Sequence, residues 1–374
     1  LKRLILFIIL CMFLDPIQIK AEEINLPYEE SIDYDALQTT VDQIVGNDTF
    51  DFKAFVLYLV KSGQGVSIAS LGDKLISSLK EQIVGEKSLL VRLGTILLFA
   101  AIFANFTEAF RNRQVAEIGH YICYLILFSI AMVSFQEMME LAVTVLTNVQ
   151  DFMRALVPAY YMALMFSSGV TTSGLFYQGI LIVIQIVERV ILQGILPMIR
   201  VYFLLSMMNN LTKEGMFSKM TELLESLIRW LMKGFLGAVT GYHVMQGLLV
   251  PITDSLKNRI AIKTMNLLPG VGNVLGTAAS TVISAGIVIK NAIGVAGLIV
   301  LLLILSVPLL RLLFSAMVYK VFSAVAEPIS DKRIIACLGA TYKAISLLLY
   351  VTFITGILFM LTIVIVMATT NGRV

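Results

Sequence analysis

The sequence predicts an all-α, polytopic helical membrane protein, and three observations support this fold class. Of the 374 residues, 58% are hydrophobic and only 14% are charged, and the mean hydropathy is +0.89. Soluble proteins contain about 45–50% apolar and about 25% charged residues. Apolar runs near or above the roughly 18 residues that a spanning helix needs recur from Leu89 onward. One proline-punctuated apolar pattern also occurs twice. We expect about seven spanning helices.

Residues 1–21 have the pattern of a signal peptide. Lys2 and Arg3 precede the apolar stretch Leu4–Leu14, which is too short to span a membrane. Ala21 is a candidate cleavage point, but Ile19 is larger than the residue preferred three positions before a cut. The sequence therefore leaves two alternatives, a cleaved signal peptide and an uncleaved membrane anchor.

Residues 22–88 are acidic, and we expect them to form an extracytoplasmic helical segment. Apolar residues recur at helical spacing within Val56–Lys61 and again within Leu71–Ile83. The segment could dock a partner or serve as a solvated lead-in, and the sequence favours neither.

The membrane domain is expected to cover residues 89–374. Leu89–Phe106 forms the first span, and the arginines that follow place the next loop in the cytoplasm. The next span, Ile118–Phe135, is expected to lead back from the cytoplasmic side to the outer side of the membrane. Met138–Leu156 then has apolar residues at three- and four-residue spacing, which predicts an amphipathic helix at the outer surface or against the bundle.

An internal repeat is predicted from two pairs of prolines. Pro158 and Pro197 are 39 residues apart, as are Pro269 and Pro308, and the offset between the pairs is 111 residues. Each proline is expected to kink or end a helix. The repeat would comprise residues 158–208 and 269–319, within copies of about 152–250 and 263–368.

Both copies are predicted to contain broken or re-entrant helices. The first has a polar break at Ser167–Gly174 between apolar legs, and the second opens on a glycine-rich stretch. Such backbone survives at membrane depth only where protein or water satisfies it. In the second copy a stripe of small residues permits close helix packing, and it consists of Gly272, Gly276, Ser280 and Ser284. Tight packing and the lining of a conduit both remain open.

Gly234–Val250 is a further candidate span, with Trp230 at an interfacial depth. The basic residues on either side of it, Lys233 and Lys257, both favour the cytoplasm, which one crossing does not permit. The segment is therefore re-entrant, or one basic loop lies outside.

Four charged residues in apolar surroundings are candidate functional or structural residues: Glu188, Arg189, Arg200 and Arg311. Charges within a spanning helix are costly and are often functional. Glu188 and Arg189 are adjacent and do not face each other, so each needs another partner or lies near an interface. The two other arginines each follow a proline by three residues, where they could anchor to head groups, cap free carbonyls or contact an ion.

Catalytic and metal-binding patterns are missing from the sequence. Neither His120 nor His243 has ligands at metal spacing. The glycines of Gly270–Gly276 follow no strand, so they do not indicate a nucleotide site. The net charge of +3 is spread over segment ends, which argues against nucleic acid. We expect no enzyme, no cofactor, no metal and no disulfide framework.

The order and spacing of these parts resemble the stage III sporulation protein AE family of endospore-forming bacteria. The resemblance covers most of the chain and is carried by the signal, the acidic segment and three stretches. These stretches are Leu156–Gly174 (LVPAYYMALMFSSGVTTSG), Leu268–Gly297 (LPGVGNVLGTAASTVISAGIVIKNAIGVAG) and Pro308–Lys320 (PLLRLLFSAMVYK). The family implies a multi-pass protein of the mother-cell membrane surrounding the forespore.

The resemblance implies a membrane subunit of a transenvelope channel that links mother cell and forespore during endospore formation. Its implied partners are membrane lipids, other proteins of the same sporulation operon and a forespore membrane protein, and a homo-oligomer stays open. A secondary transporter for a small solute and a scaffold that recruits ring-forming proteins are the alternatives. A transporter fits the repeated, broken segments, whereas few intramembrane charges argue against it.

Overall fold

The computed structural model describes residues 34–45, 50–62, 91, 94–95, 113–211, 216–265, 272–328 and 332–370. The predicted signal peptide, Pro269 and most of Leu89–Phe106 lie outside this part. Every regular element within it is helical, which confirms the all-α class. Four described helical segments are long and apolar enough to cross a membrane: Tyr124–Ser168, Thr172–Asn210, Thr281–Ala326 and Lys332–Thr369.

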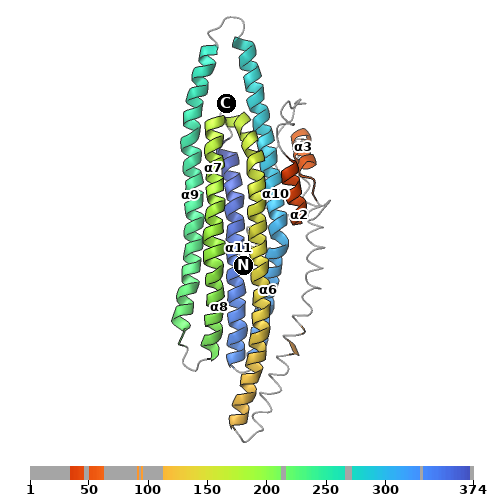
Figure 1. The fold of residues 1–374 in the computed structure, drawn as a ribbon, viewed down its shortest axis with the longest axis vertical. Helices are drawn as coiled ribbons and strands as arrows, with labels where there is room; N and C mark the ends of the chain where they lie inside the picture. Colours follow the sequence, from red (N-terminus) through yellow and green to blue (C-terminus); the bar gives the residue numbers. More distant parts are fainter. Residues whose placement is uncertain are drawn as a thin grey trace.

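Five long helical runs pass up and down the molecule (Figure 1). They are α6 (Arg113–Ser168), the continuous run of α7 (Val170–Val187), η2 (Glu188–Ile195) and α8 (Leu196–Leu211), α9 (Ser218–Met265), α10 (Gly272–Ala326) and α11 (Lys332–Thr369). Consecutive runs are antiparallel, because each is joined to the next by a short connection at one end of the bundle. We call the end that holds the α8–α9 connection the lower end, as in Figure 1.

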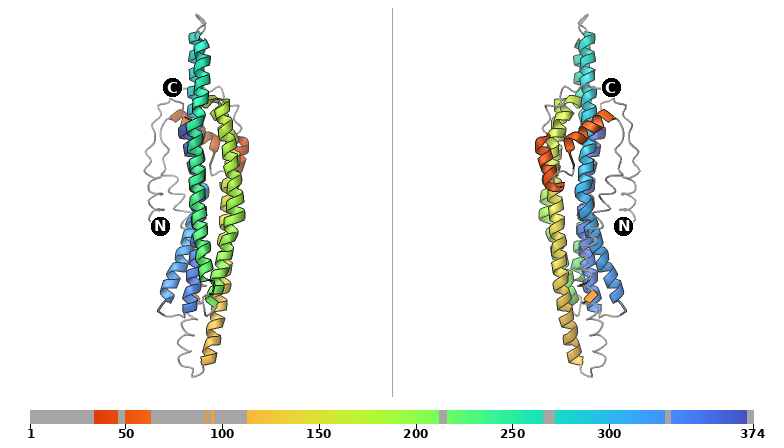
Figure 2. Two further views of the ribbon diagram at one scale, coloured as in Figure 1. Left: turned by 90° about the vertical axis from the view of Figure 1, so that its left-hand side faces the viewer. Right: turned by 90° about the vertical axis from the view of Figure 1, so that its right-hand side faces the viewer.

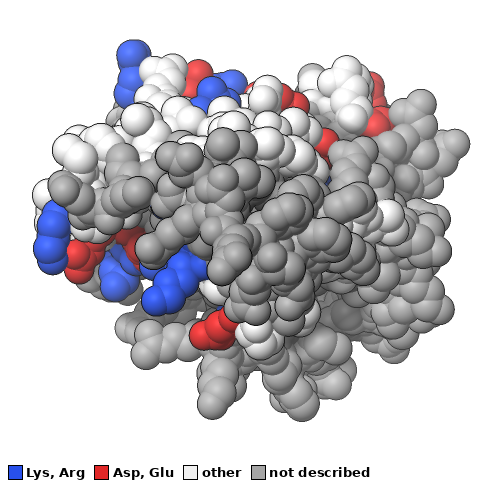
Figure 3. Space-filling view, turned by 90° about the horizontal axis from the view of Figure 1, so that it is seen from below, with Lys and Arg blue, Asp and Glu red and all other residues white. Residues whose placement is uncertain are grey.

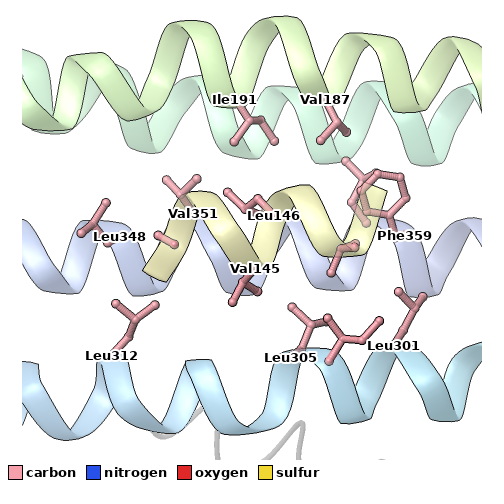
Figure 4. Close-up of a cluster of buried hydrophobic side chains, with 14 of the residues drawn as sticks. Val145, Leu146, Val187, Ile191, Leu301, Leu305, Leu312, Leu348, Val351 and Phe359 are labelled. Carbon is pink, nitrogen blue, oxygen red and sulfur yellow. The ribbon is translucent and has the colours of Figure 1, made fainter. Parts of the chain in front are cut away.

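Helix α11 lies at the centre of the bundle and contacts all four of the other runs. Its apolar side chains are buried around most of its circumference, which is the pattern of a helix enclosed by others. Figure 4 shows Leu348, Val351 and Phe359 of α11 among apolar side chains of α6, η2 and α10.

The predicted amphipathic helix Met138–Leu156 is not a separate element. It continues Ile118–Phe135 within the 56 residues of α6. Its apolar face, including Ala142, Val149 and Phe152, is buried in the bundle. The prediction that it packs against the bundle is therefore confirmed.

The predicted break at Ser167–Gly174 is present, but it is a hairpin turn rather than a re-entrant loop. Gly169 alone separates α6 from α7, with φ 92° and ψ 161°. The apolar legs on either side belong to long helices, so they are not the two short legs that the sequence suggested. A φ of this sign is readily adopted only by glycine, which explains how one residue reverses the chain.

The proline positions have different local structures. Pro158 and Pro308 lie inside α6 and α10 and end neither helix. Pro197 follows the eight-residue π-helix η2, in which the N–H of Leu196 bonds to the carbonyl of Ile191. A proline ring clashes with the carbonyl four residues before it, and the wider π turn gives that carbonyl room.

The internal repeat is not confirmed. Residues 158–168 form the last turns of α6, whereas the described part of the corresponding stretch, 272–279, forms the first turns of α10. Only the second parts agree, since 170–211 and 281–322 are both descending helical runs (Figure 1).

Helix α9 contradicts a re-entrant reading of Gly234–Val250. It is helical without a break over 48 residues, so Lys233 and Lys257 lie about 36 Å apart along its axis. The two basic stretches therefore do not share one side of a single crossing.

Two short helices, α2 (Asp35–Val45) and α3 (Phe52–Ser62), lie against the long ones. Helix α2 packs on α6 and α3 packs on α10, and Figure 2 shows both on the same side of the bundle. The helical character predicted for Val56–Lys61 is confirmed by α3, and Leu71–Ile83 lies outside the described residues.

Candidate functional site

Paired basic and tyrosine side chains occur in the lower half of the bundle, spread over about 25 Å of α11 between Arg333 and Tyr350. Arg229 lies over the ring of Tyr350 at 5.4 Å, Lys320 over Tyr342 at 5.3 Å and Arg333 over Tyr121 at 5.4 Å. Trp230, the only tryptophan, is 69% exposed beside Arg229. Aromatic and basic residues gather at membrane–water boundaries, and described Lys and Arg side chains are visible from this end in Figure 3.

The part of α11 above Tyr350 is long enough to cross the hydrocarbon core. From Tyr350 to Thr369 the helix rises about 29 Å, which matches the roughly 30 Å of the hydrocarbon core. Described basic residues occur at both ends of the bundle, since Lys219 lies in the first turn of α9 and Lys257, Arg259 and Lys263 lie in its last turns. The positive-inside rule therefore does not orient the bundle.

Lys290 is fully buried where α11 ends. Its Nζ donates to Thr370 Oγ1 at 2.8 Å and to the carbonyl oxygen of Met367 at 3.3 Å. Ser168 Oγ donates to the carbonyl oxygen of Thr370 at 3.1 Å. The last carbonyls of a helix lack intrahelical partners and attract cations. Lys290 thus caps α11 and joins α10 to α11, while Ser168 joins α6 to the same turn.

Further buried polar side chains surround this cap, and we call the group the upper polar cluster. It comprises Ser167, Ser168, Thr172, Ser173, His243, Gln246, Lys290 and Thr370. Gln246 Nε2 donates to the carbonyl of Leu175 at 2.6 Å. Both ring nitrogens of His243 are buried without a hydrogen-bond partner among the described residues. The cluster therefore contains more hydrogen-bonding groups than the described side chains satisfy.

Glu188 has a partner on the neighbouring helix. Arg154 Nη2 donates to its Oε2 at 2.6 Å and Arg154 Nη1 donates to Asp151 Oδ1 at 3.2 Å. The three side chains are 42–48% exposed, and together they form what we call the charged strip. Glu188 follows Val187, which lies level with Phe359 (Figure 4). The strip is therefore near mid-depth between Tyr350 and Thr369.

The ion pairs of this strip do not include the three other candidate arginines. Arg189 and Arg200 are exposed on η2 and α8, and Arg311 is half-buried on α10. Of the two alternatives expected for Glu188, another partner or a place near an interface, the structure shows a partner. The partner, Arg154, lies on the polar side of Met138–Leu156.

Sequence reasoning missed Lys290 as a candidate. The signal was present, because it is the only charged residue between Pro269 and Arg311, and a lone charge in a spanning run indicates function by default.

Two open cavities are lined by described residues. One, of about 430 Å³, lies between α6 and α7 beside Pro158 and Tyr177. The other, of about 770 Å³, lies between α8, α9 and α11 and is lined by both acidic and basic side chains. No group of three metal-ligating side chains occurs among the described residues.

Comparison with known proteins identifies the family. The family model described as stage III sporulation protein AE matches residues 50–370. The stage III sporulation protein AE of Bacillus subtilis (strain 168) is 26% identical over 299 residues, covering 79% of this chain and 75% of that protein. No solved structure matches. The family match covers well over half of the sequence, so this chain belongs to the stage III sporulation protein AE family.

Proposed function

We propose that this chain is an integral membrane subunit of a multiprotein transenvelope channel that links mother cell and forespore during endospore formation. It resides in the mother-cell membrane around the forespore. Family membership and four membrane-crossing helical segments support this proposal. Its partners are other proteins of the same operon and a forespore membrane protein.

The charged strip is the observation that carries the proposal. A charged side chain at the centre of a bilayer costs about 2.5–3.5 kcal/mol on insertion scales. Arg154, Asp151 and Glu188 partly compensate one another, yet each stays more than 40% exposed on the outer surface of the bundle. Lipid tails offer these groups no hydrogen bond. A neighbouring protein or an aqueous conduit does, and both belong to a larger assembly.

The lengths of the helices also support an assembly. Helices α6 and α10 have 56 and 55 residues, about 82–84 Å of helix, against a hydrocarbon core of about 30 Å. The α9–α10 hairpin extends past the C-terminus of α11 (Figure 1). Such projections give partner proteins rigid surfaces outside the bilayer. The proposal assigns no catalytic step and no cofactor to the chain.

A secondary transporter is the second candidate, and Lys290 favours it. Buried cations within spanning helices mark substrate or proton pathways in many transporters. In this protein Lys290 is bonded to the end of α11, which supplies a structural reason for its presence. The channel subunit is therefore the better-supported function.

Replacement of the strip by apolar residues tests the proposal. The variant Arg154→Leu with Asp151→Leu and Glu188→Leu should insert and fold, because it suits a lipid-facing surface. Its recovery of operon-encoded proteins in affinity purification should fall by about tenfold, equivalent to ~1.4 kcal/mol of binding, and sporulation should fall with it. Lys219→Gln is the control, since it removes an ion pair whose side chains are 93% and 74% exposed at the start of α9.

Two results would contradict the channel-subunit function. One is wild-type recovery of partners and wild-type sporulation by the triple-leucine variant. The other is solute transport by the purified wild-type chain alone in liposomes, which would establish the transporter instead.

A further inference from the structure

An apolar face of α9 is exposed along the outer side of the bundle, which is the side turned to the viewer in the left-hand view of Figure 2. Its bulky members are 37–69% exposed, and they are Met220, Leu223, Leu227 and Trp230. Its small members continue the same line of positions, and they are Gly234, Gly237 and Gly241. An added Cβ at any of these three glycines would meet nothing within 4 Å among the described residues. We call these seven residues the α9 seam.

The spacing of the α9 seam is that of a helix which pairs with another helix. Its members alternate between three and four residues apart from Met220 to Gly241, and this seven-residue repeat is the pattern of a coiled-coil contact. The seam extends for about 32 Å along α9. Its glycines permit two helix backbones to approach each other closely. The matching cover is therefore a second helix.

Neither lipid nor water is a good cover for this part of α9. Charged residues share its turns, since Lys219 and Glu222 are 93% and 74% exposed, and charges surrounded by lipid are costly. The four described segments that are apolar enough to cross a membrane belong to other helical runs. In water, the exposed leucines and Trp230 would be the costly groups. A protein helix suits the seam in either medium.

The sizes of the seam side chains fit a second copy of α9 that runs in the same direction. In a parallel pair each seam residue meets its own equivalent, and each side chain enters a hole formed by four residues of the facing helix. The hole for Trp230 includes the position four residues further along the facing helix, which is Gly234. The missing side chain at that position leaves room for the indole ring.

The charges beside the seam also favour a parallel pair. Lys219 and Lys233 flank the seam at the same heptad position. In a parallel pair this position faces apolar residues of the other helix, Leu224 and Ala238, whereas an antiparallel pair would set lysine opposite lysine. Copies of one chain in one membrane share an orientation, so their α9 helices are parallel.

We propose that two copies of this chain pair through the α9 seam, with the two α9 helices parallel. A contact along about 32 Å of one helix is at the small end of specific interfaces. Copies confined to one membrane therefore pair, because confinement raises their effective concentration, and copies dispersed in detergent separate. The inference goes beyond the channel role and does not depend on it, because the seam itself carries the argument.

Cysteine cross-linking tests the pair in membranes of cells that produce the full-length chain. Under copper–phenanthroline oxidation, Leu223→Cys and Leu227→Cys should each form a disulfide-linked dimer, because equivalent seam residues of a parallel pair lie within reach of a disulfide. Glu222→Cys is the matched control, since Glu222 is exposed on the same helix beside the seam. We expect at least about tenfold more linked dimer at the seam positions than at the control. The wild type, with its own three cysteines, gives the baseline.

Gly234→Leu provides a second measurement that separates pairing from folding. The new side chain enters open space in the single chain, and leucine is a better helix former than glycine, so the melting temperature in detergent should not fall. In the pair the same side chain fills the hole for Trp230. The linked dimer of Leu227→Cys should therefore fall by at least about tenfold when Gly234→Leu is added.

Four results would overturn the proposal. They are linking at the seam no greater than the wild-type baseline, equal linking at Glu222→Cys, unchanged linking of Leu227→Cys in the presence of Gly234→Leu, and linkage of Leu227→Cys to a different protein. The last result would show that a helix of another chain covers the seam.

Discussion

Among the glycines of the described residues, the closest approach to backbone atoms of another helix occurs at Gly286, on the face of α10 that meets the end of α6. A Cβ at this position would lie 2.8 Å from the carbonyl carbon of Phe166 and 2.9 Å from the backbone nitrogen of Ser167. Ordinary contact begins at 3.4 Å, so the two helices would have to separate by about 0.6 Å. Backbone atoms cannot rotate away as a side chain can, and the next residues form the Gly169 hairpin.

The magnitude follows from two opposing effects of Gly286→Ala. Replacing glycine with alanine inside a helix stabilises it by about 0.8–1.0 kcal/mol. Overpacking of a well-packed interior costs about 1–3 kcal/mol. Gly237→Ala separates the two effects, because Gly237 is exposed inside α9 and a Cβ there meets nothing within 4 Å. The helix gain is common to both variants, so their stabilities should differ by about 1–3 kcal/mol.

The assay is thermal unfolding of the two variants and the wild type, purified in the same detergent. Gly237→Ala should melt above the wild type, and Gly286→Ala should melt below Gly237→Ala by several degrees. Adding Phe166→Ala should not rescue Gly286→Ala, because the close contacts include backbone atoms. If Gly286→Ala melts as high as Gly237→Ala, the packing of α10 on α6 is not as tight as the distances indicate.

Three further predictions concern the hairpin, the cap and the strip. Gly169→Ala forces a side chain into a backbone region that favours glycine, so the melting temperature should fall by an amount equivalent to about 1–3 kcal/mol. Lys290→Met removes the donor from Thr370, and amide hydrogen exchange should become faster in the last turn of α11 while the rest of that helix stays protected. Glu188→Gln alone leaves Asp151 to pair with the strip arginine, so partner recovery should stay closer to wild type than in the variant that also carries Asp151→Asn.

The membrane class and the main helical segments could be predicted from the sequence, because long apolar runs indicate segments that are surrounded by lipid or by other apolar groups. The residues at which the helices begin and end could not be predicted. Met138–Leu156 is amphipathic and Ile118–Phe135 is apolar, yet both belong to α6, since a helix that leaves the bilayer continues where its apolar stripe is still covered by neighbours. The π-helix before Pro197 has no sequence signature beyond the proline itself.

The small-residue stripe shows the same limit. Gly272, Gly276, Ser280 and Ser284 have the expected spacing, but Ser284 is exposed. Among the described residues, close approach on α10 occurs at Gly286, Gly294 and Gly297, where an added Cβ would come within 2.8 Å of another helix. Spacing identifies a face of a helix, and only the packing of neighbours decides which face is covered.

The candidate site was partly predictable for a related reason. Glu188 stood out as a charge in an apolar run, and a partner elsewhere was one of the two alternatives inferred for it. The identity of that partner depends on the α6–α7 hairpin, which brings together two residues 34 positions apart. The repeat is not confirmed, because Pro269 lies outside the described residues and Pro158 lies inside α6. What recurs among the described residues is two descending helical runs, 170–211 and 281–322.

Lys290 and the charged strip both place charge within apolar surroundings, but they are stabilised in different ways, and this difference predicts their roles. Lys290 is fully buried and bonds to the end of α11 within its own chain, so its contribution should appear in the stability of the isolated protein. The charged strip leaves each member more than 40% exposed, so its remaining stabilisation has to come from outside the chain. Substitution of Lys290 should therefore alter the folded protein before any partner binds. Substitution of the strip should leave the isolated protein intact and alter only its assembly, and an equal effect of both on the isolated protein would contradict this division.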